Sequence, residues 1–369
     1  MSVVELEIQL LAVTVAVACA LPGVFLVLRR MALMSDAISH TVLLGIVVAF
    51  FIVEDLASPL LILGAAATGV LTVALVESIR GTGLVKEDAA IGLVFPALFS
   101  IAVILITRFA GDVHLDTDAV LLGELALAPF RRLEIGGIDV GPRALWVMLG
   151  ILGLNVAFLA AFYKELKLST FDASLAAALG FSPVLMHYAF MAVVSVTAVG
   201  AFDSVGSILV VAFMIVPPAA AYLLSDRLGR VIWLSALIGA LSAVSGYWLA
   251  RWLDASIAGS MAGAAGALFG LVLLSAPERG LIAQARRRAR QRVEFTRQML
   301  AIHLLHHEGT AAAAEESRLD HQSRHLRWSP DQAGRIVGAA RRAGFVTLKE
   351  ERLFLTEAGR AEARKAMLR

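Results

Sequence analysis

The chain of 369 residues contains a single cysteine, Cys19. One thiol excludes both an internal disulfide framework and a metal cluster held by thiolates. The phosphate-binding pattern G-x-x-x-x-G-K-[ST] is also missing, because Gly81 and Gly83 lack the required spacing to Lys86. The chain therefore cannot hydrolyse ATP by that route, and active transport would need a partner ATPase or an ion gradient.

Charge is scarce as well. Only 17% of the residues are charged, 59% are hydrophobic, and the mean hydropathy is +0.80. Apolar runs close to the ~20 residues with which a helix crosses a membrane lie near residues 8–28, 33–53, 59–79, 90–109, 144–163, 183–202, 206–224, 231–252 and 257–276. The sequence predicts an all-α polytopic membrane protein with about nine transmembrane helices, or eight if one run is re-entrant.

Basic residues in the short loops predict the orientation. When nine helices are drawn, these clusters share one side, which should be cytoplasmic. The acidic N-terminus then lies outside and argues against a cleaved signal peptide, although Arg131, Arg132 and Arg143 in the loop 110–143 disturb the pattern. The clusters are Arg29 and Arg30, Arg80 and Lys86, Lys164 and Lys167, Arg227 and Arg230, and residues 286–292.

The charge balance divides the chain into two domains. Residues 1–285 hold 14 Lys or Arg against 20 Asp or Glu, whereas residues 286–369 hold 18 against 10. We expect a transmembrane domain at 1–280 and a basic cytoplasmic domain at 281–369. The acidic membrane domain favours a cation as cargo, and the basic domain could meet nucleic acid, anionic lipid or an acidic protein surface.

Asp36 and His40 are the strongest candidates for a functional site. They lie four residues apart inside the second apolar run, so both side chains leave one helix face. An intramembrane carboxylate is costly unless it is compensated, and carboxylate plus imidazole suits Mn, Fe or Zn dications. Asp203 and His187 lie in or near other runs, and Asp203 is the better additional ligand. An outer loop with His114 among Asp112, Asp116 and Asp118 is either a capture loop or simply solvated.

The segment from Lys164 to Pro183 predicts a short cytoplasmic helix. Ser169 or Thr170 can cap it, and Gly180 closes it. Such a helix is either a contact for a soluble motor or an ordinary interfacial helix. The residues that carry the expected contact are Phe171, Asp172, Leu175, Leu179 and Gly180.

Small residues and prolines indicate where helices pack or bend. The pairs at 259/263 and 266/270 have the G-x-x-x-G spacing, which favours packing within the chain over a dimer seam. Pro22-Gly23 and Pro217-Pro218 interrupt their helices, as a kink or as a flexible gate.

Two motifs resemble a known family. The run from Met34 to Gly45 is similar to the D-x-x-S-H-a-v-l-p-G signature of the permeases of bacterial ABC importers for manganese, zinc and iron, with Leu44 where many members have proline. The run from Val205 to Leu224 is similar to that family's late V-G-x-[LI]-L-V-x-A-x-x-[IV]-x-P-[AP]-A-x-A-x-L motif.

The resemblance covers residues 5 to about 280. It implies a permease dimer with a second copy or a paralogue, two ATPase subunits and an extracytoplasmic metal-binding lipoprotein at the cytoplasmic membrane. Within the family, Asp36 and His40 match the metal-coordinating pair, and the region from Phe171 to Gly180 matches the helix that contacts the ATPase.

The basic domain needs its own interpretation. A helical pattern covers residues 292–306, and Ser329 with Pro330 opens a helix that runs to Arg342. A β-hairpin follows at residues 345–355 around a charged tip. The pattern is similar to a small α+β winged helix, and residues 355–360 resemble the segment after the wing in repressors of the MarR and diphtheria-toxin-repressor kinds. DNA or protein contact would use Gln332, Arg335, Arg341 and Arg342. His303, His306 and His307 could bind metal, but His306 and His307 are adjacent and point to different faces, which favours an ordinary solvated helix end.

Two functions remain open at this point. The leading one is the permease of an ATP-driven importer for a transition-metal dication, Mn²⁺ before Zn²⁺ or Fe²⁺, with no permanently bound cofactor. The preference for Mn²⁺ follows from oxygen and nitrogen ligands without thiolate and from the second motif's likeness to manganese-type members. The alternative is a membrane-tethered, metal-responsive DNA-binding regulator.

Overall fold

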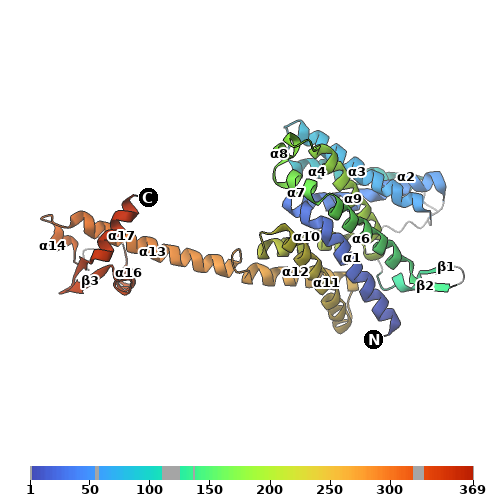
Figure 1. Cartoon of the computed structure of the whole chain (residues 1–369). Helices are drawn as coiled ribbons and strands as arrows, with labels where there is room; N and C mark the ends of the chain where they lie inside the picture. The colour runs from blue at the N-terminus through green and yellow to red at the C-terminus, as the bar shows by residue number, and fades with distance from the viewer. Residues whose placement is uncertain (1, 55–57, 110–124, 136–137, 319–327, 369) are drawn as a thin grey trace. The chain divides into compact units, whose positions relative to one another are not determined.

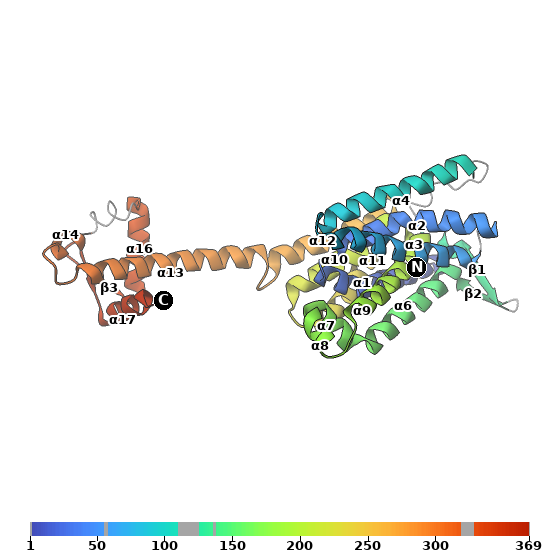
Figure 2. The same ribbon diagram turned by 90° about the horizontal axis from the view of Figure 1, so that it is seen from above.

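The computed structural model describes every residue except 1, 55–57, 110–124, 136–137, 319–327 and 369. The chain forms two compact units, Met1–Arg279 and Gly280–Arg369. Figures 1 and 2 show the first unit as a bundle of long helices and the second as shorter elements that follow the helix α13.

Nine helices in the described part of the first unit are long and apolar enough to cross a membrane. This confirms the predicted helical, polytopic architecture. The nine are α1 (Val3–Leu28), α2 (Ala32–Val53), α3 (Pro59–Gly81), α4 (Glu87–Phe109), α6 (Arg143–Ala161), α9 (Pro183–Val205), α10 (Ser207–Leu224), α11 (Leu228–Leu253) and α12 (Ile257–Ser275). Between them lie the 3₁₀ turn η1 (Ala128–Phe130), the strands β1 (Arg132–Ile135) and β2 (Ile138–Pro142), and the short helices α7 (Tyr163–Phe171) and α8 (Ala173–Ala178). The antiparallel hairpin β1–β2 was not expected from the sequence.

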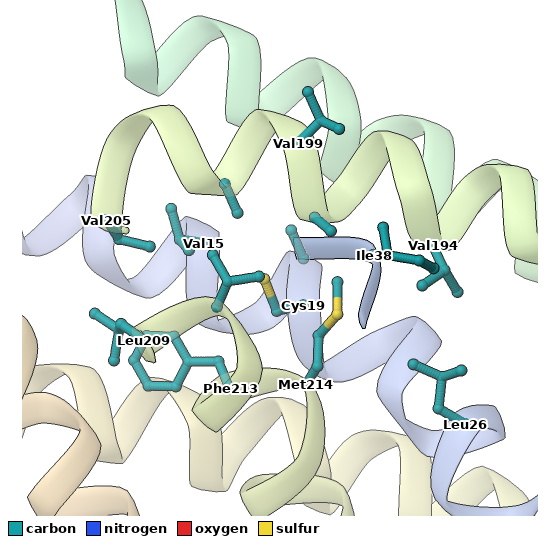
Figure 3. Packing of buried hydrophobic residues seen from close by; sticks show 14 of the residues in the cluster. Val15, Cys19, Leu26, Ile38, Val194, Val199, Val205, Leu209, Phe213 and Met214 are labelled. Carbon is teal, nitrogen blue, oxygen red and sulfur yellow. The ribbon is translucent and has the colours of Figure 1, made fainter. Parts of the chain in front are cut away.

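The core of the bundle lies around α1. Figure 3 shows apolar side chains of α1, α2, α9 and α10 meeting around Cys19, which is fully buried, as are Phe213 and Met214. The backbones of α1 and α10 also touch here, because a Cβ atom at Gly23 would lie 2.1 Å from the carbonyl oxygen of Met214. The expected interruption of these helices is wrong, since α1 runs through Pro22 and α10 through Pro217 and Pro218. The two proline-containing segments pack against each other, and there is no room for a side chain at Gly23.

A second close approach joins α2 to α3. A Cβ atom at Gly45 would lie 2.3 Å from the carbonyl oxygen of Gly64. Four residues before Gly45, the buried hydroxyl of Thr41 accepts a hydrogen bond of 2.7 Å from Thr72. Backbone contact and a satisfied polar pair together fix α2 on α3.

The expected packing of the glycine pairs in α12 is wrong. Nothing would lie within 4 Å of a Cβ atom at Gly263, Gly266 or Gly270. The tight approach of α12 occurs instead against Gly246 of α11, whose added Cβ would meet the backbone of Met261 at 2.3 Å. Spacing alone therefore did not show which small residues meet another helix.

Ion pairs define one end of the bundle. Arg132 donates hydrogen bonds of 3.2 Å to both carboxylate oxygens of Glu7 and is also paired with Asp139. Arg251 at the end of α11 pairs with Glu5. Arg132, one of the three arginines that disturbed the predicted orientation, is thus paired with acidic residues. Figure 1 shows α7 and α8 at the other end of the bundle.

The second unit combines helices with a β-hairpin. Its described elements are α13 (Leu281–His307), α14 (Ala313–Glu316), α16 (Pro330–Arg342), β3 (Val346–Lys349), β4 (Arg352–Leu355) and α17 (Glu357–Met367). Its buried core includes Leu300, Leu304, Val337, Val346 and Leu353. The predicted cap and hairpin are confirmed, since Ser329 and Gln332 form a reciprocal capping box and Val346 pairs with Leu355. The first helix, by contrast, begins at Leu281 and not near residue 292.

Candidate metal site

Asp36 and His40 lie side by side on α2. The Nε2 atom of His40 is 3.4 Å from the Oδ1 atom of Asp36. The side chain of His40 is 26% exposed and that of Asp36 is 47% exposed, so both polar groups are accessible at the surface of the single chain. At 1.5 Å of rise per residue, His40 lies roughly 12 Å along the helix from Ala32. The pair therefore lies within a helix long and apolar enough to cross a membrane, where a carboxylate without a compensating partner is costly.

Aromatic rings from α4 hold the imidazole. The ring centroids of Phe95 and Phe99 lie 5.1 and 6.1 Å from that of His40. On the same helix, the buried hydroxyls of Ser35 and Ser39 donate hydrogen bonds to backbone carbonyls one turn back. These hydroxyls are thus satisfied locally, and the carboxylate and imidazole remain as ligands that can bind an ion.

The structure does not bring Asp203 to this pair. Asp203 is 79% exposed and lies 3.9 Å from Arg131. Within the described residues of the first unit, no group of three His, Cys, Asp or Glu side chains is close enough to hold one ion. Asp203 as a ligand stays a prediction, and its observed partner is an arginine.

His187 belongs to a polar cluster at the end of the bundle that carries α7. Its Nε2 atom is 3.6 Å from Glu77, and its Nδ1 atom is 3.4 Å from Arg29. Arg29 also donates hydrogen bonds of 2.9 Å to Ser169 and 3.0 Å to Thr170. His187 is therefore placed with the links to α7 and not with the carboxylate and imidazole of α2.

The residues predicted to contact an ATPase lie on α7, on α8 and in the turn after them. Phe171, Leu175 and Leu179 are 63%, 45% and 58% exposed, an apolar surface on a segment outside the spanning helices. Gly180 has a φ of +87°, which closes this segment without the steric cost that a side chain would bring.

The predicted cap of this segment is wrong. The side chain of Asp172 caps α8 by accepting a hydrogen bond of 2.9 Å from the Leu175 amide. Ser169 and Thr170 lie inside α7, where their hydroxyls accept from Arg29. The role of these two hydroxyls depends instead on an arginine that lies 140 and 141 residues away in sequence.

The remaining predicted residues are dispersed. Gln332, Arg335, Arg341 and Arg342 are exposed on α16, although Gln332 also serves the capping box. His303 and His307 are half-buried and lie together, while His306 is exposed, so the expected solvated helix end is correct for His306 alone. The outer loop with Asp112, His114, Asp116 and Asp118 lies outside the described residues.

Sequence reasoning missed the contribution of Arg29. Burial lowers the pKa of its guanidinium to about 10, so the group is still protonated at neutral pH. Its guanidinium carbon also lies 5.0 Å from the centre of the Phe190 ring. The dibasic pair at 29 and 30 was interpreted only as an orientation signal, and nothing local distinguished the half-buried arginine from its neighbour.

Comparison with known proteins adds independent information. Residues 6–276 match the model of the ABC 3 transport family. The chain is 48% identical over 354 residues to "Zinc transport system membrane protein TroD" of Treponema pallidum, covering 96% of both chains. It is 50% identical over 270 residues to "Manganese transport system membrane protein MntD" of Bacillus subtilis, covering 73% of this chain and 91% of that protein.

Two solved structures resemble this chain over about three quarters of its length. "PsaBC from Streptococcus pneumoniae in complex with Fab" has a TM-score of 0.63 and 28% identity, covering 76% of this chain and 94% of that chain. A putative metal-chelate type ABC transporter in an inward-facing conformation shares the fold, with a TM-score of 0.53 and 20% identity, covering 73% and 85%. The family match ends at residue 276, so the likeness of the second unit to winged-helix repressors stays a prediction.

Proposed function

This chain belongs to the ABC 3 transport family, and we propose that its Asp36 and His40 bind the transition-metal dication that an ATP-driven importer moves across the cytoplasmic membrane. The chain is the permease subunit and not an enzyme, since ATP hydrolysis belongs to a separate ATPase subunit. The family membership favours this function over a membrane-tethered regulator of transcription.

The observation that carries the proposal is the carboxylate and imidazole pair at 3.4 Å inside a spanning helix. A dication that enters the membrane must exchange water for protein ligands, and an anionic oxygen with a nitrogen beside it supplies two of them. The remaining coordination positions would be filled by water or by a second permease subunit. The open side of the pair is compatible with a dimer in which the ion passes between two permease copies.

Uptake of ⁵⁴Mn²⁺ by cells that express the complete importer tests this proposal. Asp36→Ala and His40→Ala should each reduce uptake by about tenfold or more, because each removes a ligand. Asp254→Asn and His306→Ala remove the same chemical groups at exposed positions, so they are matched controls and should retain uptake. Normal uptake by either site variant, at equal levels of inserted protein, would refute the assignment.

The choice of metal is a further proposal. An oxygen and nitrogen ligand set without thiolate suits Mn²⁺, and it also admits Zn²⁺ and Fe²⁺. We propose Mn²⁺ as cargo, delivered from outside by a metal-binding lipoprotein. Competition of ⁵⁴Mn²⁺ uptake by unlabelled Zn²⁺ or Fe²⁺ measures the preference, and stronger competition by Zn²⁺ than by unlabelled Mn²⁺ would reverse it.

We also propose that α7 and α8 dock onto the ATPase subunit. The exposed apolar side chains Phe171, Leu175 and Leu179 offer a surface that a soluble partner can bury. Leu175→Asp should abolish copurification of the ATPase without affecting metal binding, because a carboxylate would be buried unpaired in the interface. Leu127→Asp changes a similarly exposed leucine directly before η1, at the end of the bundle that carries β1 and β2, and should have no effect. Full copurification of Leu175→Asp would contradict the docking surface.

The second unit is proposed to be cytoplasmic and winged-helix-like. The capping box of α16, the β3–β4 hairpin and the backbone bridge from Arg318 to Arg352 support this proposal. Its role would be contact with protein or anionic lipid, or control of the permease, in preference to DNA binding. Salt-sensitive binding of the full chain to its own promoter, weakened by changes at Arg335 or Arg341, would overturn that preference.

A further inference from the structure

A cluster of metal-ligating side chains lies in the second unit, apart from the α2 pair. His303 and His307 are four residues apart on α13, and their ring centroids are separated by 4.8 Å. The Nε2 atom of His303 lies 3.1 Å from the Oε2 atom of Glu316 at the end of α14. One ligand atom from each of the three residues lies within 4.8 Å of the others.

The protein backbone holds these three groups in place. The turn after α13 is closed by hydrogen bonds from the amide and hydroxyl of Thr310 to the carbonyl of His307. Directly after Glu316, the carbonyl of Ser317 accepts a hydrogen bond of 2.8 Å from Leu353 on β4. The backbone that carries Glu316 is thus tied to the hairpin, and its carboxylate contacts His303, which favours a preorganised site.

The surroundings make this cluster different from surface charges. The side chains of His303 and Glu316 are only 10% and 14% exposed. A carboxylate in such a place is stabilised by positive charge, which a bound cation can supply. Two imidazoles beside one carboxylate are a ligand set that binds Zn²⁺, Mn²⁺ and Fe²⁺ and leaves a further position for water.

The spacing also fits an ion. Around a tetrahedral dication with bonds of about 2.0–2.2 Å, neighbouring ligand atoms are roughly 3.3 Å apart. The observed 3.1 Å between His303 and Glu316 is close to this separation. A ring nitrogen of His307 lies within 4.8 Å of the ligand atoms of His303 and Glu316, whereas the exposed His306 leaves a different helix face.

We propose that His303, His307 and Glu316 form a second binding site, for a transition-metal dication, in the C-terminal unit. A bound ion links α13 to α14 and, through Ser317, to β4. If the proposed function holds, this site binds the ion after import and so registers the supply of cargo. Metal binding itself does not depend on transport.

The test uses the full chain in lipid nanodiscs, purified without a polyhistidine tag and stripped of metal by a chelator. The double change Asp36→Ala/His40→Ala removes the α2 pair, so that any remaining site can be titrated with Co²⁺ and Zn²⁺. We expect one Co²⁺ per chain, with the intense visible absorption of a four-coordinate ion, displaced by Zn²⁺. In that background, His307→Ala and Glu316→Gln should each weaken binding by about tenfold or more.

His306→Ala is the matched control, since it removes a neighbouring imidazole from the same helix end, and it should bind Co²⁺ as before. Equal affinity for Co²⁺ in the His306 and His307 variants, or no binding in the parent background, would overturn the proposal and leave an ion pair between His303 and Glu316. His307→Ala changes α13 and Glu316→Gln changes α14, so misfolding of one of these variants does not decide the result. Uptake of ⁵⁴Mn²⁺ by the same variants is measured separately, so failure of the transport function is distinguishable from failure of this site.

Discussion

The link between Arg29 and α7 leads to a quantitative prediction. Burial lowers the pKa of Arg29 to about 10, which corresponds to a cost of about 3 kcal/mol for keeping the guanidinium charged inside the protein. Its hydrogen bonds to Ser169 and Thr170 contribute about 1.5–3 kcal/mol each, as is typical of a charged donor. The two contributions are of similar size, so the charge is tolerated only while both hydroxyls accept from it.

Removing both acceptors should therefore lower the free energy of unfolding more than removing the charge does. Ser169→Ala/Thr170→Val leaves a buried guanidinium with the 3.4 Å contact to His187, and we expect a loss of about 3 kcal/mol. Arg29→Met removes the charge and retains an apolar stem, so its cost should be about 1 kcal/mol. The triple variant should resemble Arg29→Met, because the hydroxyls matter only when the guanidinium is present.

The free energies of unfolding can be compared by titration with SDS in mixed micelles, and ⁵⁴Mn²⁺ uptake reports the coupling. A double-mutant cycle between Arg29 and the two hydroxyls should give an interaction energy of about 2–3 kcal/mol. Uptake should fall in the hydroxyl variant and partly recover in the triple variant. If the two changes add without interaction, Arg29 does not hold α7, and the reasoning is refuted.

Three further predictions address packing, pH and the second unit. Gly23→Ala should lower the thermal midpoint of the purified chain and reduce its free energy of unfolding by about 1–3 kcal/mol or more, because the new methyl group would lie 2.1 Å from a backbone oxygen. Gly266→Ala adds a methyl group in open space and should leave the midpoint unchanged. The hydrogen bond from Arg360 holds the pKa of Glu308 below its usual value. The ionised Glu308 therefore stabilises the second unit above about pH 4.5, and this stabilisation is lost as the pH falls through the lower pKa of the folded state. Glu308→Gln should flatten this part of the pH–stability curve measured by circular dichroism. Deleting residues 293–369 should leave ⁵⁴Mn²⁺ uptake within about twofold of the full chain, since the family match ends at residue 276, and loss of assembly would show that this unit is structural.

Features encoded by local sequence were predictable. The spanning helices could be predicted from the length of the apolar runs. The start of α16 could be predicted from Ser329 and Gln332, because a capping box depends on two residues that are three positions apart. The β3–β4 hairpin follows from alternation around its charged tip, where Glu350 and Glu351 adopt positive φ values of 47° and 61°. The Asp36 and His40 pair was visible because both residues lie on one helix, four positions apart.

Features that depend on distant contacts were not predictable. The role of Ser169 depends on Arg29, and the pairing of Asp203 depends on Arg131. His303 and His307 gained a third partner only when the turn after α13 brought Glu316 back along the helix. In each case the deciding group is close in space but is not marked by any local pattern.

The attachment of α2 to α3 has a consequence for how such a protein can diversify. At 100° per residue, Gly45 lies about 180° around the helix from Asp36, so the face that anchors α2 is opposite the face that carries the pair. Gly45 on the anchoring face is constrained, because an added Cβ atom would lie 2.3 Å from the Gly64 carbonyl oxygen, whereas Asp36 is 47% exposed. If Asp36 and His40 bind the ion as proposed, their exchange would alter the affinity for ions and leave the anchoring contacts in place. Selection for a different metal can therefore act on one side of a single helix while the scaffold is inherited unchanged.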